Sequence, residues 1–150
     1  MFTRIHHVAF VVGDLDAATA AFETQFGVDR LAREEMTGEF ELEVALYPVG
    51  DALVELITPT TERGWVYEHW REHGDGFFHI AFAVDDIRER MAELRAAGVE
   101  FASEEPQQGY DWLVATMAEG DTLTTMQLVE DDTPPEKRQR RAIGTRESPD

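Results

Sequence analysis

The hydrophobic positions of this chain alternate between short apolar runs and two stretches with helical spacing. Each stretch repeats apolar side chains every three to four residues, which predicts an amphipathic helix. The stripes consist of Leu15, Ala18, Phe22 and Phe26 in the first helix, and Ile87, Met91 and Leu94 in the second. An aspartate precedes each stripe and a glycine follows it, at Asp14 and Gly27 and at Asp86 and Gly98. These residues are suited to cap the beginning and the end of each helix.

Short strand-like runs follow each predicted helix, separated by turn residues. They cover residues 29–36, 39–47 and 52–57 after the first helix, and 100–102, 113–117 and 122–129 after the second. Thr-Gly and Val-Gly-Asp supply turns in the first half, and Gly120-Asp121 supplies the last turn of the second. The segment between the halves, about 63–74, reads as a linking helix.

The two halves repeat each other. HVAFVVGD (7–14) matches HIAFAVDD (79–86) at five of eight positions, at an offset of 72 residues. Each half is therefore predicted to be a βαβββ module, the first at about 4–59 and the second at about 76–129. We expect an α+β fold in which both modules form a half-open, eight-stranded, barrel-like sheet around a cleft. Residues 131–150 have few apolar side chains and predict a flexible tail.

Composition and charge narrow the possible partners. The 150 residues suffice for one domain, and a net charge of −18 disfavours nucleic acid and anionic membranes as partners. No apolar run approaches the roughly 20 residues of a membrane span, and the N-terminus lacks a signal-peptide pattern, so we expect a cytoplasmic protein. The absence of cysteine excludes disulfides, thiolate metal sites and cysteine nucleophiles.

The same offset connects four polar residues that lie in apolar runs. His7 corresponds to His79, and Glu55 in LVELI corresponds to Gln127 in TMQLV. Burying such groups is costly unless they are paired, and taken singly each can be a satisfied core group or a solvated strand end. As a symmetric set they suit a divalent metal (Co, Ni, Mn, Zn or Fe) with open positions. We therefore expect the cleft to be a metal cleft.

Other polar and aromatic residues are open to two interpretations. Strand alternation predicts that His6 and the neighbouring His7 point to opposite faces of their strand. His6 is then a structural or a solvent-facing residue. Tyr110 and Trp112 either line an aromatic pocket or simply pack. His69 and His73, four residues apart, can share a helix face for packing or subunit contact rather than for a second metal.

Three segments carry a resemblance to a known family. RIHHVAFVVGDLDAA, YPVGDALVELITP and GDGFFHIAFAVDDIRERMAELRAAGV resemble the vicinal-oxygen-chelate superfamily over about residues 4–130, most closely its methylmalonyl-CoA epimerase branch. The superfamily also includes glyoxalase I, extradiol dioxygenases, fosfomycin-resistance enzymes and bleomycin-binding proteins. The resemblance implies metal ligation by His7, Glu55, His79 and Gln127.

The resemblance also implies an activity. The epimerase branch inverts a carbon next to a thioester through a metal-stabilised enolate, with an acid and a base on opposite faces of that carbon. Its two glutamates would correspond to Glu43 and Glu55. This chain departs from the branch at Gln127, where a glutamate is usual, so that Glu55 must supply a second base or shuttle the proton alone, as in a glyoxalase-like isomerisation.

The expected substrate is an acyl-CoA or a small carbonyl compound, and the expected assembly is a homodimer. Two other functions remain open at this point. One is an iron-dependent oxygenase, because His7, His79 and Glu55 satisfy a two-histidine, one-carboxylate centre. The other is a metal-free binding or resistance protein that sequesters a small molecule.

Overall fold

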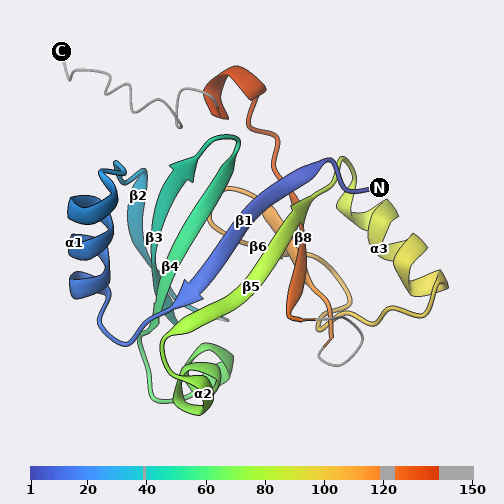
Figure 1. Cartoon of the computed structure of the whole chain (residues 1–150). Coiled ribbons are helices and arrows are strands. Elements are labelled where there is room, and N and C mark those ends of the chain that lie inside the picture. Colours follow the sequence, from blue (N-terminus) through green and yellow to red (C-terminus); the bar gives the residue numbers. More distant parts are fainter. Residues whose placement is uncertain (39, 119–123, 139–150) are drawn as a thin grey trace. The chain divides into compact units, whose positions relative to one another are not determined.

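The computed structural model describes residues 1–38, 40–118 and 124–138, which form helices and strands in one α+β fold (Figure 1). The strands are β1 (Arg4–Val11), β2 (Ala32–Met36), β3 (Leu42–Val49), β4 (Ala52–Pro59), β5 (Gly76–Ala83), β6 (Gln107–Gln108), β7 (Leu113–Thr116) and β8 (Met126–Glu130). The helices are α1 (Leu15–Phe26), α2 (Gly64–His73) and α3 (Ile87–Ala96). One eight-stranded sheet has the order β2-β3-β4-β1-β5-β8-β7-β6. The predicted α+β fold with two βαβββ halves is confirmed.

The chain divides into two compact units. The first unit contains Met1–Ala9 and Phe77–Asp132, and the second contains Phe10–Gly76 and Thr133–Asp150. Strand β1 begins in the first unit and ends in the second. The compact units therefore differ from the two halves of the sequence, because the N-terminal residues belong with the second half of the chain.

In the second unit, α1 packs on one face of an antiparallel β2-β3-β4 meander. Its core contains Leu15, Ala45, Tyr47 and Leu56. The predicted caps are confirmed: the Asp14 side chain accepts a hydrogen bond from the backbone N–H of Ala17 at 3.0 Å, and Gly27 is left-handed with a φ of 63°. A side chain there would be strained, which explains the glycine at the end of the helix.

In the first unit, β8 pairs in parallel with β5 and antiparallel with β7, and α3 covers one face. A buried cluster forms its core, made of Val84, Ile87, Met91, Ala115, Met117 and Leu128. The predicted N-cap Asp86 accepts from the backbone N–H of Glu89 at 2.9 Å. Helix α3 ends at Ala96, and Gly98 after it has a φ of 95°.

One strand of the second half differs from the prediction. Residues 100–102 form only a single bridge, between Phe101 and Met117, and the paired strand is β6 at Gln107–Gln108. The chain turns between these segments, where the Ser103 hydroxyl donates to the Glu105 carbonyl at 2.8 Å, and Pro106 has no N–H to offer to a ladder. The predicted turn at Gly120-Asp121 lies outside the described residues.

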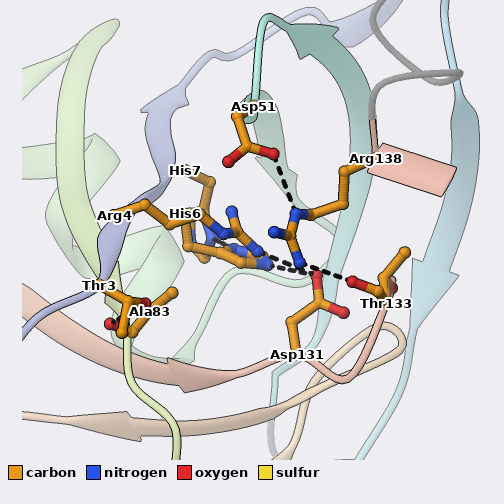
Figure 2. A network of polar contacts seen from close by, with 9 residues as sticks. All are labelled: Thr3, Arg4, His6, His7, Asp51, Ala83, Asp131, Thr133 and Arg138. Carbon is orange, nitrogen blue, oxygen red and sulfur yellow. Dashed lines mark hydrogen bonds and ion pairs between the residues drawn. The ribbon is translucent and has the colours of Figure 1, made fainter. Parts of the chain in front are cut away.

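The segments that connect and follow the modules are partly helical. Helix α2 occupies the place of the expected linking helix. The chain after β8 makes a short helical turn at residues 135–138, where Arg138 donates to the Asp51 carboxylate at 2.9 Å and to the Thr133 carbonyl at 2.6 Å (Figure 2). The flexibility predicted for 131–150 stays a prediction, since 139–150 lie outside the described residues. No helix within the described residues has the length and apolarity needed to cross a membrane.

Candidate metal centre

Two histidines occupy the same place on equivalent strands. Strands β1 and β5 share one order of exposed, intermediate and buried residues along their eight positions, and His7 and His79 are both buried. Their Nε2 atoms lie 2.9 Å apart. The repeat predicted this equivalence, and the first unit brings the two rings into contact.

Gln127 lies beside this pair. On β8 it is the register partner of Ala81, two residues after His79 on β5, so that Gln127 and His79 share one face of the sheet. Its amide N–H donates to the Thr116 hydroxyl at 3.1 Å, and the side chain also hydrogen-bonds with His7. Three of the four predicted ligands thus meet within the first unit.

The environment of His7 favours its neutral form. Burial lowers the pKa of His7 well below its usual value of 6.5, and the neighbouring His79 and His6 lower it further. The hydrogen bond with Gln127 acts in the opposite direction and is the smallest of these effects on the pKa. A neutral imidazole with a free lone pair is the form that binds a metal.

The geometry of the two rings fits a metal ion. At 2.9 Å, only one proton can lie between the two Nε2 atoms, so at least one ring directs a lone pair at the other. Two nitrogens that bind one cation at about 2.1 Å each and at right angles lie about 3 Å apart. A cation bound by both nitrogens therefore suits this pair without a large movement of the rings.

Glu55, the fourth predicted ligand, lies on β4 in the second unit, directly opposite Leu46 of β3. It is only 7% exposed, and burial raises its pKa from 4.5 to about 8. A carboxyl group in such surroundings holds a proton at neutral pH unless a cation replaces it. Glu55 therefore has the properties both of a metal ligand and of a group that gives and takes a proton.

The structure does not bring Glu43, the second predicted catalytic residue, to the same face as Glu55. Glu43 is opposite Thr58 in the β3–β4 register, three residues from the partner of Glu55, and strand alternation directs it to the other face. There it accepts from the Arg33 guanidinium at 2.5 Å. Glu43 is therefore engaged by an ion pair on the side of α1, and its catalytic role stays a prediction.

His6 is structural, and the solvent-facing alternative is wrong. It is 1% exposed, its Nδ1 lies 2.7 Å from Nδ1 of His7, and its Nε2 lies 2.9 Å from the Asp131 carboxylate (Figure 2). Asp131 is a partner that sequence reasoning misses, because it falls at the start of the predicted tail. Two features of the sequence could have indicated this contact. Asp131 directly follows the apolar residues of β8, and His6 is a second histidine on β1 that needs a partner.

The aromatic residues near the histidines pack against them. Trp112 is buried, and its ring centroid lies 4.5 Å from that of His6 and 6.1 Å from that of His7. Tyr110 contacts Trp112 edge to face at 5.5 Å. The packing interpretation of Trp112 is therefore confirmed. On α2, His69 and His73 stack on each other at 4.4 Å.

The duplicated βαβββ fold is that of the vicinal-oxygen-chelate proteins, and this chain has a histidine on the first strand of each module. The chain belongs to the glyoxalase/bleomycin resistance protein/dioxygenase superfamily, whose sequence pattern matches residues 6–116.

Relatives within this superfamily have different activities. The chain is 32% identical over 95 residues to a probable lactoylglutathione lyase of Vibrio cholerae, covering 63% of this chain and 67% of the relative. It is 28% identical over 111 residues to the ethylmalonyl-CoA/methylmalonyl-CoA epimerase of Cereibacter sphaeroides, covering 73% and 82%. A structure of Streptomyces coelicolor methylmalonyl-CoA epimerase with 2-nitronate-propionyl-CoA has a TM-score of 0.84 at 25% identity, covering 88% of this chain and 99% of that one.

Proposed function

We propose that this protein is a metal-dependent isomerase that moves a proton at a carbon next to a carbonyl group. The observation that carries the proposal is the pair of buried imidazoles, 2.9 Å apart at Nε2, with the Gln127 side chain beside them. Buried histidines with facing nitrogens are costly as core residues and useful as ligands.

We propose four ligands for the metal: His7, His79, Gln127 and Glu55. His7, Glu55 and His79 are all buried, and each offers one ligand atom of a type that metal ions accept. The position of Glu55 at the same repeat offset as Gln127 supports its inclusion. Two nitrogen and two oxygen donors leave coordination positions for the oxygens of a substrate.

A divalent cation at these ligands would supply positive charge that stabilises negative charge on the carbonyl oxygen of the substrate. The protein residues do the rest. Glu55 takes the proton from the carbon and returns it, since burial favours the protonated form of this carboxyl and a bound cation would favour the ionised form, so that both forms are accessible. Gln127 would bind the cation without exchanging a proton, because a side-chain amide does not titrate near neutral pH.

A single proton-transferring group has a stereochemical consequence. Inversion of a carbon requires proton removal on one face and return on the other, whereas one carboxyl returns the proton to the face from which it came. With Glu43 on the opposite face of its strand pair from Glu55, the proposed site holds one base. We therefore propose that exchange or migration of the proton is faster than inversion, as in a glyoxalase-type isomerisation.

For the substrate we propose a small carbonyl compound or an acyl thioester. The names of the relatives support both classes, since one is a probable lactoylglutathione lyase and another is an ethylmalonyl-CoA/methylmalonyl-CoA epimerase. The charges favour a substrate with few phosphates. The net charge is −18, and arginines such as Arg33, Arg63 and Arg138 are engaged by carboxylates.

An iron-dependent oxygenase is the second candidate. His7, His79 and Glu55 have the composition of the two-histidine, one-carboxylate centre that non-haem oxygenases use for Fe(II). An oxygenase requires iron and consumes oxygen, and the isomerase does neither. Metal content and oxygen consumption of one purified sample therefore distinguish the two functions.

Metal analysis and proton exchange test the proposal. The protein is purified without chelator, its metal content is measured by mass spectrometry, and methylmalonyl-CoA and a methylglyoxal–glutathione hemithioacetal are incubated with it in D₂O. Stoichiometric Co, Ni, Mn or Zn with deuterium incorporation at the reacting carbon supports the isomerase. Iron with oxygen consumption supports the oxygenase instead, and a protein that binds none of these metals would be a metal-free binding protein.

Assembly and location belong to the same proposal. We expect a homodimer in the cytoplasm, and sedimentation velocity of the purified protein measures the assembly directly. A concentration-independent monomer would remove the dimer from the proposal without affecting the chemistry.

A further inference from the structure

We propose that His6 and Asp131 are positioning residues that fix the tautomer of His7, so that its Nε2 presents a lone pair to the metal. This inference rests on the proposed function for the role of the metal, but the tautomer itself is a property of the metal-free protein. Asp131, His6 and His7 form a continuous hydrogen-bonded chain within the first unit (Figure 2).

The direction of this chain follows from the chemistry of its first member. A carboxylate only accepts hydrogen bonds, so His6 must donate its Nε2–H to Asp131, across 2.9 Å. A neutral His6 then has a lone pair on Nδ1. That lone pair accepts the Nδ1–H of His7 across 2.7 Å, and His7 is left with a lone pair on Nε2, the atom that faces His79.

Burial makes this order of donors and acceptors hard to reverse. The side chains of His6 and Asp131 are each 1% exposed, so water is not available to replace either partner. Arg4 lies 3.7 Å from the same Asp131 oxygen and favours the charged, acceptor-only carboxylate. Trp112 packs edge to face on His6 at 4.5 Å and restricts the ring to its observed position.

The internal repeat shows that packing alone does not require a histidine at this position. The residue at the equivalent place on β5 is Phe78, which is also buried and also precedes a histidine. A phenylalanine fills the space with no ring nitrogen to satisfy. His6 instead has two ring nitrogens that need hydrogen-bond partners. Its Nε2 bonds to Asp131 and its Nδ1 bonds to His7. Hydrogen bonds of this kind to a metal-binding histidine orient the ring and set its tautomer.

His6→Phe is therefore the matched test, because it makes the first repeat resemble the second. It preserves ring volume and removes the acceptor for Nδ1–H of His7. His6→Asn is the conservative variant, since its side-chain oxygen takes the place of the imidazole Nδ1 and accepts the same bond. Asp131→Leu removes the acceptor for Nε2–H of His6, and Asp132→Leu changes the exposed neighbour in the same way as a control.

Two measurements are made on each full-length variant. Nitrogen-15 NMR of the metal-free, histidine-labelled protein reports which nitrogen of His7 carries the proton, and competition with a chromophoric chelator gives the affinity for Zn²⁺. We expect Nδ1–H at His7 in the wild type, in Asp132→Leu and in His6→Asn. We expect a shift toward Nε2–H and a Zn²⁺ affinity lower by about 10–100-fold in His6→Phe and Asp131→Leu.

A wild-type His7 with its proton on Nε2 overturns the inference, as does a His6→Phe protein with wild-type tautomer and affinity. If His6→Phe fails to fold, Asp131→Leu decides by the same two measurements. If the wild type shows Nδ1–H at His7 but binds none of the metals, the proposed function fails while the positioning of His7 stands.

Discussion

Glu43 and Glu55 lie on opposite faces of the β3–β4 pair. Glu43 is the register partner of Thr58, and Leu46 is the partner of Glu55, so that Glu43 is three positions from Leu46 and Glu55 is three positions from Thr58. An odd offset along a strand places side chains on opposite faces. Glu43 shares its face with Ala45 and Tyr47, which pack under α1. The arrangement separates two carboxylates that the sequence presents as a catalytic pair.

The first prediction contrasts these two residues. Glu55→Gln should lower proton exchange by about 10²–10⁴-fold, the usual contribution of a general base. Glu43→Gln should leave it within about twofold, because it loses only a partly exposed ion pair worth at most about 1 kcal/mol. Deuterium incorporation into the substrate, followed by NMR at equal metal content, measures both. Equal losses in the two variants would return Glu43 to the catalytic machinery.

The second prediction concerns the departure at Gln127. Gln127→Glu adds a titratable group beside His7 and His79, and the Thr116 hydroxyl can donate to it in place of its present role as acceptor. If the site then holds two bases, the rate of inversion of methylmalonyl-CoA should rise toward the rate of exchange, by about 10²-fold. Circular dichroism or chiral coupling assays measure inversion. The exchanged pair Glu55→Gln/Gln127→Glu serves as the control with a single base.

The third prediction is a dependence of stability on pH in the metal-free protein. The pKa of Glu55 is 4.5 in the unfolded chain and about 8 in the folded protein. Between these values the folded state holds a proton that the unfolded state has lost, so the free energy of unfolding falls as pH rises, by up to about 1.4 kcal/mol per unit. His7 has the opposite effect, because its pKa is lowered on folding, and it removes stability as pH falls below 6.5.

The two contributions therefore oppose each other between about pH 4.5 and 6.5, and only that of Glu55 remains between about 6.5 and 8. Urea unfolding in the presence of chelator at a series of pH values measures the slope in the upper range. Glu55→Gln should flatten the decline there. The same decline in wild type and variant would mean that Glu55 titrates normally.

The fourth prediction is stabilisation by metal. An ion that binds only the folded state adds about 2.7 kcal/mol at a concentration 100-fold above its Kd. For a protein of this size that corresponds to a rise in Tm of roughly 5–10 °C. Calorimetry with Zn²⁺ and then with chelator measures the rise and its reversal. His79→Ala should abolish the shift, whereas His73→Ala, on α2, should retain it.

Local signals in the sequence predicted the parts of this fold that local chemistry determines. Asp14 and Asp86 cap their helices as expected, since a cap involves only residues within the first turn. The repeat identified His7 and His79 as equivalent because equal strands bury equal positions. Within one unit, that is enough to bring the rings together.

Long-range pairing and register were beyond such signals. His6 bonds to Asp131 across 125 positions of sequence, and no periodicity connects them. Alternation in β3 indicates that Glu43 and Leu46 point in opposite directions, but not which of them shares a face with Glu55; the strand register decides that. The strand β6 was displaced from the expected place because Pro106 and the turn before it interrupt the ladder.

The assignment of Met1–Ala9 to the compact unit of the second half has a practical meaning for protein engineering. The internal repeat suggests the point between α2 and β5 as a place to divide the gene. A division there would separate Met1–Ala9 from Phe77–Asp132, although both belong to one compact unit. Either half produced alone should be poorly folded. Co-expression of the two pieces, by contrast, should regenerate the protein as a non-covalent complex.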